Sequence, residues 1–287
     1  MSTILRTRMI QDLRIRNYSW HTIDAYIRRV ANFAKHFEKS PDLLGREHIR
    51  EYQVFLMETK KASWGVFIQT VCALRFLYEV TLGRPEMIEY IPYPKPEKKL
   101  PIVLSVEQVH EFFNFLPTLK HRTIVKTMYA AGLRVSEVVR LLVQDIDNQR
   151  MVIRVQQGKG KKDRYVPLSP TLLKQLRKYW KAYQPQYWLF PGQSKNLPLS
   201  SGAVQRAVAQ ARRRSSIHKP VSCHTMRHCY ATHNLEAGTD LRTIQIRLGH
   251  RSLHTTAMYL HVAAEASQLT HKPVDLLQRS EDNDTTR

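Results

Sequence analysis

Apolar residues recur at helical spacing along most of this chain. In the first clear segment they follow Ser19, a residue suited to cap a helix N-terminus, and Pro41 comes after the pattern ends. The same period predicts helices over 46–59 and 63–81. The N-terminal part should therefore be a small all-helical unit. The apolar positions of its first helix are Ile23, Tyr26, Ile27, Val30, Phe33, Ala34 and Phe37.

A proline- and lysine-rich segment interrupts the helical spacing of apolar residues between Pro85 and Pro101. Such a composition favours extended backbone over packed structure. We therefore predict a linker over 91–103, between a helical domain at 1–90 and a second domain at 104–270. The last residues, 271–287, turn polar and acidic and are predicted to be a tail outside the fold.

The second domain is predicted to be helical apart from one hairpin. Ser105 and Gln108 have the spacing of a capping box. Val152, Ile153 and Val155 are β-branched and precede "GKGKK", so we expect a β-hairpin with a lysine-rich tip and a second strand at 164–168. The fold class is thus mainly α with a small β-hairpin. The remaining predicted helices cover 105–116, 120–131, 136–142, 170–183, 202–214, 225–236, 240–248 and 253–263.

Charge indicates the partner. The 287 residues contain 45 Lys and Arg against 24 Asp and Glu, a formal net charge of +21. Such a charge favours polyanions, of which nucleic acid is the commonest in solution. No apolar run approaches the roughly 18 residues of a membrane span, and no signal peptide is evident. Three cysteines without a disulfide spacing are typical of a reducing compartment, so we expect a cytoplasmic protein with no membrane partner.

Several polar residues could carry chemistry, although each has an ordinary alternative. Tyr259 is typical of a packed aromatic residue, Arg134 of a surface cation and Lys159 of a solvated lysine. Apolar neighbours on both sides of Arg134, with Glu137 placed to orient it, argue for a fixed guanidinium. The spacing of three further residues also fits a shared site. His224 and Arg227 lie one helical turn apart, and His250 follows the glycine that ends a predicted helix.

In chain order these residues are Arg134, Lys159, His224, Arg227, His250 and Tyr259, and the last step spans nine positions. With this set, the sequence resembles the tyrosine recombinase (phage integrase) family, its short Xer-type members most of all. The resemblance covers roughly residues 15–264. It is carried by "YSWHTIDAY", "GLRVSE", "GKGKKDRYVPL", "HTMRH" and "LGHRSLHTTAMYLHV".

The chemistry explains these residue types. A tyrosine oxygen can hold a broken phosphodiester covalently, but free tyrosine has a pKa of about 10 and is almost wholly protonated at neutral pH. Two arginines on the phosphate oxygens would stabilise the developing charge. Lys159 suits protonation of the leaving 5′-oxygen, His224 suits proton handling near the nucleophile, and His250 suits a hydrogen bond to the phosphate.

The resemblance implies the rest. Tyr259 would form a 3′-phosphotyrosyl intermediate on double-stranded DNA, and neither a cofactor nor a metal is implied. The family fold implies a SAM-like core-binding domain and a catalytic domain that close around DNA as a C-shaped clamp. A homotetramer on two DNA sites is expected, with a monomer in free solution left open.

Three alternatives stay open at this point. A zinc site could form from the cluster at 223–233, where two His and Cys pairs have helical i,i+4 spacing, although one helix cannot direct all five side chains at one ion. A DNA-binding protein of the same fold could have lost its chemistry. A type IB topoisomerase-like activity would use the same tyrosine chemistry on a single duplex. The cluster consists of Cys223, His224, His228, Cys229 and His233.

Overall fold

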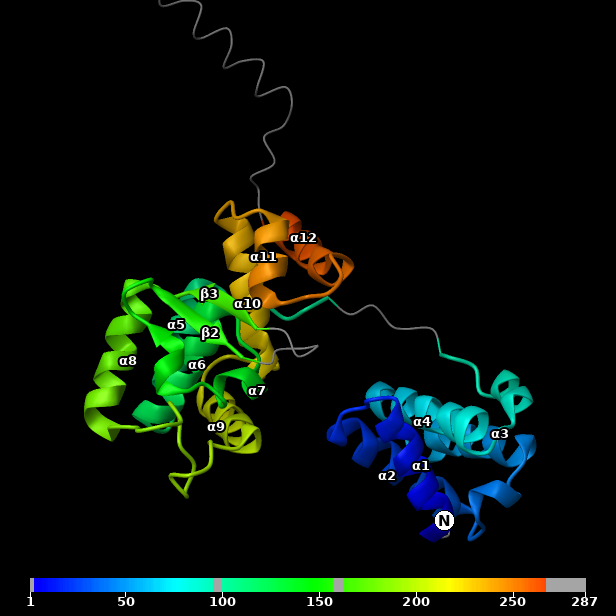
Figure 1. Ribbon diagram of the computed structural model, residues 1–287. Helices are drawn as coiled ribbons and strands as arrows, with labels where there is room; N and C mark the ends of the chain where they lie inside the picture. The colour runs from blue at the N-terminus through cyan, green and yellow to red at the C-terminus, as the bar shows by residue number, and fades with distance from the viewer. Residues whose placement is uncertain (1–2, 95–99, 157–162, 267–287) are drawn as a thin grey trace, which may run out of the picture. The chain divides into compact units, whose positions relative to one another are not determined.

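The computed structural model describes residues 3–94, 100–156 and 163–266 (Figure 1). The chain divides into two compact units, Met1–Lys98 and Lys99–Arg287. Part of the predicted linker and the whole predicted tail, 271–287, lie outside the described residues. Each unit has its own hydrophobic core. Within the described part of the chain, no helix has the length and apolar character needed to cross a membrane.

Helices are the only regular elements in the described part of the N-terminal unit, residues 3–94. Ser19 caps α2 by accepting a hydrogen bond from the Thr22 backbone N–H, as its position predicted. A buried tyrosine, Tyr78, donates to the carbonyls of Pro41 and Leu44 and so fixes the loop between α2 and α3. The helices are α1 (Thr3–Ile15), α2 (Trp20–His36), α3 (Arg46–Val54, with a π turn over Phe55–Thr59) and α4 (Trp64–Phe76, with a π turn over Leu77–Thr81). Short 3₁₀ segments cover Pro41–Leu43 and Pro85–Tyr90.

Helix α1 was not predicted from the sequence. Its apolar stripe consists of Leu5, Met9 and Leu13, spaced four residues apart among charged and polar positions, and all three are buried in the core of this unit. Three apolar positions among charged residues do not distinguish a helix from an irregular terminus, unless the surface that they pack against is known. The helices predicted over 46–59 and 63–81 are confirmed, because the π turns carry α3 and α4 to those ends.

The second unit is built from helices around a small sheet. Ser105 and Gln108 form the predicted capping box at the start of α5. The predicted helix at 136–142 is shorter than expected, since α7 ends at Val138. The helices are α5 (Val106–Asn114), α6 (Leu119–Ala131), α7 (Val135–Val138), α8 (Pro170–Tyr183), α9 (Ser201–Arg214), α10 (Cys223–Glu236), α11 (Leu241–Leu248) and α12 (His254–Ala266).

The sheet has three antiparallel strands in the order β1 (Ile146–Asp147), β2 (Val152–Val155) and β3 (Arg164–Pro167). Ile153 pairs with Val166, and both are buried, whereas the next pair, Arg154 and Tyr165, is exposed. This alternation confirms the predicted hairpin. Strand β1 is too short to show a period in the sequence. The hairpin tip, 157–162, lies outside the described residues.

Helix α10 organises the second unit, since it packs against α6, α11 and α12 (Figure 1). Its close approach to α6 depends on Gly132, which ends α6 with a φ of +64°. A Cβ at Gly132 would lie 2.6 Å from the Tyr230 ring and 2.9 Å from the Leu248 side chain. Gly132 is therefore required both for its backbone conformation and for space.

We expect Gly132→Ala to destabilise the protein by about 3 kcal/mol, because a left-handed φ costs about 1–2 kcal/mol and an overpacked contact about 1–3 kcal/mol. Gly238→Ala is the matched control, since its φ is +86° but nothing lies within 4 Å of its Cβ position. That variant should lose only about 1–2 kcal/mol. Urea denaturation measures both, and equal losses would contradict the packing role of Gly132.

Candidate active site

One buried carboxylate, Glu137, lies at the centre of the site. Its Oε1 accepts hydrogen bonds from Nη1 of Arg134 at 2.7 Å and Nη1 of Arg164 at 3.0 Å. Its Oε2 accepts from the Arg134 backbone N–H at 2.9 Å and from Nη2 of Arg164 at 2.8 Å. Nη1 of Arg227 lies 3.9 Å from the same oxygen. Glu137 therefore orients arginines from the N-cap of α7, from β3 and from α10.

The ionisation of Glu137 follows from these neighbours. Burial by itself raises the pKa of this carboxyl group, but the hydrogen bonds and positive charge of Arg164 and Arg134 outweigh it and lower the pKa to about 2. Glu137 is thus a carboxylate at neutral pH. The predicted pairing of Glu137 with Arg134 is present in the structure.

Arg227 is almost completely enclosed, with 1% of the residue exposed. Its Nη1 donates to the Gly132 carbonyl and its Nη2 to the Leu248 carbonyl, both at 2.6 Å. Burial and the nearby charge of Arg134 lower the pKa of Arg227 to about 9, so the group stays cationic at neutral pH. The guanidinium is therefore fixed by the C-terminal ends of α6 and α11.

Tyr259 lies on α12 and is also buried, with 1% of the residue exposed. Its hydroxyl lies 2.9 Å from Nδ1 of His228, which is within hydrogen-bond distance. Burial raises the pKa of this phenol, and the positive charges of Arg227 and Arg134 oppose that rise. The hydroxyl is thus a neutral phenol that is subject to the positive charges of two guanidinium groups.

His250 follows Gly249, which ends α11 in the left-handed conformation. Its Nδ1 lies 2.9 Å from Oγ1 of Thr256 on α12, and its backbone N–H donates to the Gln245 carbonyl. The imidazole lies nearly parallel to the Tyr259 ring, with centroids 6.5 Å apart. His250 and Tyr259 are therefore brought together by the turn between α11 and α12.

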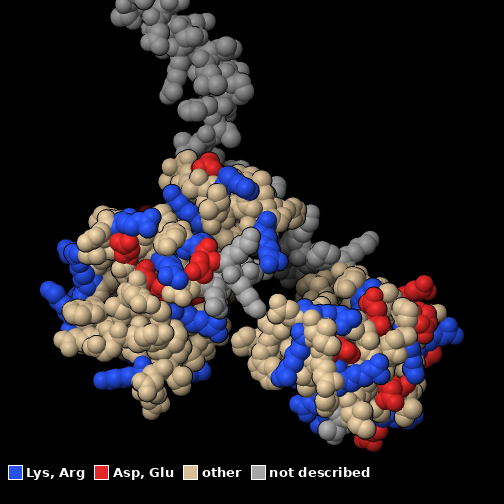
Figure 2. All heavy atoms as spheres, in the orientation of Figure 1, with Lys and Arg blue, Asp and Glu red and all other residues tan. Residues whose placement is uncertain are grey.

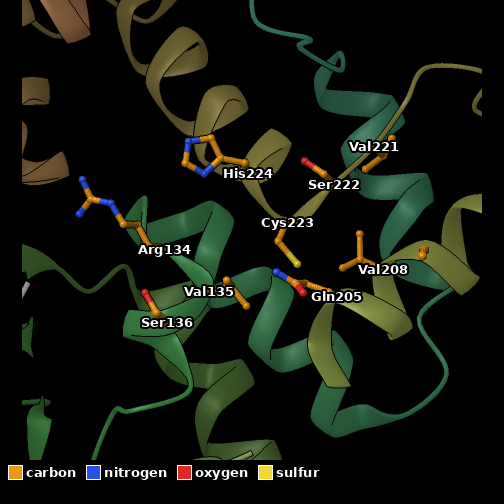
Figure 3. Close-up of a pocket in the computed structure, with 10 residues that line it drawn as sticks. Arg134, Val135, Ser136, Gln205, Val208, Val221, Ser222, Cys223 and His224 are labelled. Carbon is orange, nitrogen blue, oxygen red and sulfur yellow. The ribbon is translucent and has the colours of Figure 1, made fainter. Parts of the chain in front are cut away.

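A cavity of about 430 Å³ opens beside Arg134 and His224 (Figure 3). It lies between the N-termini of α7 and α10 and the side of α9, with Ser136, Gln205 and Ser222 among its lining. His224 is exposed, and partial desolvation together with the charges of Arg227 and Arg134 lowers its pKa. The cavity thus presents a guanidinium and an imidazole to a ligand.

The structure therefore brings together all but one of the predicted site residues. Glu137 pairs with two of the predicted arginines. The residues brought together are Arg134, His224, Arg227, His250 and Tyr259. Lys159 lies outside the described residues.

The cluster considered for zinc has other contacts. Sγ of Cys229 accepts from the Leu104 backbone N–H, and His233 lies between the Tyr129 hydroxyl and the Leu104 carbonyl. His228 contacts Tyr259 instead. Across 3–94, 100–156 and 163–266, no group of three or more His, Cys, Asp or Glu side chains is arranged to hold a metal ion.

Comparison with known proteins identifies the family. Residues 103–266 match the phage integrase family, and residues 5–88 match the phage integrase N-terminal SAM-like domain. A protein of Sinorhizobium fredii named "Putative integrase/recombinase y4qK" is 51% identical over 96% of this chain and 90% of its own length. The chain belongs to the phage integrase family. The tyrosine recombinase XerD of Staphylococcus epidermidis is 31% identical to it over 85% of this chain and 88% of that protein.

Solved structures share the fold of this recombinase. A lambda integrase dimer bound to a COC′ core site matches with a TM-score of 0.75 over 94% of this chain and 97% of that one, at 16% identity. The XerH site-specific recombinase bound to its difH substrate matches with a TM-score of 0.68 over 90% and 82%, at 21% identity. These structures show the shared fold, and the family match together with the tyrosine recombinase relatives confirms a DNA strand-breaking and rejoining enzyme, a tyrosine-type site-specific recombinase.

Two residues that contact the candidate site, Arg164 and His228, were not among the predicted site residues. Arg164 starts β3, and besides binding Glu137 its Nε donates to the Arg247 carbonyl at 2.9 Å. The signal was its place inside "GKGKKDRYVPL", directly after the lysine-rich tip. In the sequence analysis His228 appears only in the cluster considered for zinc, although its i,i+4 spacing from His224 places both on one face of α10.

The buried Glu137 should make the free energy of unfolding decrease as the pH is lowered. Its folded-state pKa is lower than its ordinary value of 4.5, so its contribution is fully present above about pH 4.5 and is lost as pH falls towards 2. We expect the stability difference between the native protein and Glu137→Gln to shrink by about 2 kcal/mol between about pH 5 and about pH 3. Urea denaturation of both proteins measures it. A constant difference over this range would show that the carboxylate is not preferentially stabilised.

Arg164→Lys should retain the charge but lose the two-point contact with Glu137 and the bond to the Arg247 carbonyl. We expect single-turnover DNA cleavage to fall about 10- to 100-fold, with DNA affinity changed less than threefold. Arg154→Lys is the matched control, because Arg154 is an exposed arginine on the adjacent strand that pairs with Asp163. Equal rates for the two variants would remove the positioning role of Arg164.

Proposed function

We propose that this recombinase cleaves one strand of a duplex recombination site by attack of Tyr259 on the scissile phosphate, and that a free 5′-hydroxyl later rejoins the strand. The observation that carries this proposal is the buried Tyr259 hydroxyl, which contacts His228 and is subject to the positive charges of Arg227 and Arg134. A tyrosine needed only for packing gains nothing from such neighbours, whereas a nucleophile that attacks a phosphate requires them.

Arg134 and Arg227 would bind the non-bridging oxygens of the phosphate. Each carbonyl contact of Arg227 uses one N–H of a guanidinium that has five, so donors remain for a phosphate oxygen. Glu137 occupies one side of Arg134 and leaves the cavity side available. Because these groups are fixed before DNA binds, little reorganisation is needed as charge develops on the phosphate.

The proton balance assigns the other roles. As the Tyr259 oxygen bonds to phosphorus, the bond from phosphorus to the 5′-oxygen breaks, and Lys159 would donate the proton that the leaving oxygen takes up. His250 would donate a hydrogen bond to the phosphate, and His224 would contact it from the cavity. The 3′-phosphotyrosyl linkage keeps the energy of the broken bond, so the proposed cycle uses no ATP, cofactor or metal ion.

Charge and relatives support the DNA substrate. Lys and Arg side chains are spread over the face of both units in Figure 2, in keeping with the net charge of +21. Two relatives of the same fold are bound to their own DNA sites. We further propose that two domains close on duplex DNA as a C-shaped clamp, that four copies assemble on two sites, and that the protein acts in the bacterial cytoplasm.

We expect Tyr259→Phe to abolish the covalent protein–DNA adduct while leaving DNA affinity within about twofold, because one oxygen is removed and the ring is kept. A nicked suicide duplex traps the adduct, and protease digestion identifies the peptide that carries DNA. Tyr230→Phe is the matched control, since Tyr230 is another buried tyrosine of the same small cluster.

Continued cleavage by the Tyr259→Phe protein, or an adduct on another tyrosine, would refute the proposal. If no adduct formed with the native protein, the chain would be a DNA-binding protein of this fold without chemistry. Relaxation of supercoiled DNA by a monomer, without strand exchange, would instead indicate the type IB topoisomerase-like activity.

A further inference from the structure

The hydroxyl of Tyr259 contacts a histidine that the predicted catalytic set does not include. Nδ1 of His228 lies 2.9 Å from the Tyr259 hydroxyl oxygen, and the two rings are 5.6 Å apart at 54°. His224, expected to handle protons near the nucleophile, lies one turn earlier and packs its ring against His228 at 4.8 Å. His224 also lines the cavity beside Arg134. His224 and His228 thus face different partners.

We propose that His228 is the catalytic base that takes the phenol proton when Tyr259 attacks phosphorus, an inference that rests on the proposed role of Tyr259. His224 then serves the phosphate from the cavity side. The division of labour follows from position: the imidazole in hydrogen-bond contact with the nucleophile is the one that can receive its proton without a further relay.

The protonation state of His228 fits this role. Burial, and then the nearby charges of His224 and Arg227, lower its pKa to about 4, so the ring is neutral at neutral pH. With its proton on Nε2, the ring has a free lone pair on Nδ1, which faces the Tyr259 hydroxyl. A charged imidazolium at this position could not accept a proton.

The step balances without any further reactant. The phenol proton moves to Nδ1 of His228, the bond between the Tyr259 oxygen and phosphorus forms, and the bond to the 5′-oxygen breaks as Lys159 supplies a proton to it. On rejoining, the imidazolium returns its proton to the phenolate leaving group. The same pair therefore works in both directions, as microscopic reversibility requires.

The DNA itself makes His228 a stronger base. Without DNA, the charge of Arg227 helps keep the imidazole neutral. A bound phosphodiester brings a negative charge to Arg227 and Arg134 and cancels part of that repulsion, so the imidazolium becomes easier to form when the nucleophile is in place. Proton transfer is thus favoured in the DNA complex and suppressed in the free protein.

The first test compares two variants in single-turnover cleavage of a nicked suicide duplex. In His228→Asn the amide oxygen can accept the hydrogen bond near the position of Nδ1 but cannot take the proton, and His228→Ala lacks both functions. We expect both variants to lose about 10²- to 10⁴-fold in cleavage rate, with DNA affinity nearly unchanged. His233→Asn is the matched control, since His233 is a hydrogen-bonded histidine of the same helix that contacts Tyr129 and Leu104. Near-native cleavage by His228→Asn would overturn the inference and leave His228 a positioning residue.

The second test removes the need for a base. A fluorinated tyrosine placed at 259, chosen to ionise near neutral pH, should reduce the defect of His228→Asn to less than about tenfold. A substrate with a bridging sulfur in place of the 5′-oxygen needs no acid, so it should rescue Lys159→Ala and leave His228→Asn defective. An undiminished defect with the fluorinated tyrosine would overturn the inference.

The failures can be told apart. Cleavage by Tyr259→Phe refutes the proposed function itself, whereas an inactive Tyr259→Phe beside an active His228→Asn refutes only the role of His228. If His228→Asn does not fold, the pH dependence of cleavage by the native protein tests whether a base takes the phenol proton. With a base, its cleavage rate should vary little across neutral pH, whereas a tyrosine that ionises unaided gives a rate rising about tenfold per pH unit. That slope would overturn the inference.

Discussion

The site depends on a single buried carboxylate surrounded by positive charge. Arg227 has 1% of its surface exposed, and a guanidinium cannot be buried at that depth without compensation. Glu137 supplies part of it, while the carbonyls of Gly132 and Leu248 accept the two closest N–H groups. Replacement of the carboxylate would leave buried cations unpaired, which is far more costly than losing an exposed ion pair.

The same carboxylate connects distant parts of the chain. Arg134 approaches it from α7, and Arg164 from β3. Arg164 also reaches the Arg247 carbonyl, two residues before Gly249, and a Cβ at Gly249 would lie 3.2 Å from its side chain. The strand that follows the lysine-rich tip is thereby joined to the turn that presents His250. The position of His250 is thus coupled to that of Arg134 through Glu137 and Arg164, that is, by packing and not by proximity in the sequence.

Local signals were predictable from the sequence, and contacts between distant segments were not. The caps at Ser19 and Ser105 and the pairing of Arg134 with Glu137 all involve residues three positions apart, so spacing alone indicates them. Arg164 and Glu137 are 27 positions apart, and His228 and Tyr259 are 31 apart. Neither contact has a local pattern, because each exists only once the sheet and α12 have packed against their neighbours.

In the free protein the candidate site carries an excess of positive charge. Three guanidinium groups, those of Arg134, Arg164 and Arg227, surround the single negative charge of Glu137, which leaves an excess of positive charge around a neutral phenol. In the proposed reaction a phosphodiester would bring one negative charge, and the pentacoordinate transition state would carry more once the phenol proton had left. The excess therefore matches the transition state better than it matches the bound substrate. Preference of this kind accelerates the chemical step, whereas equal binding of both states would only increase affinity.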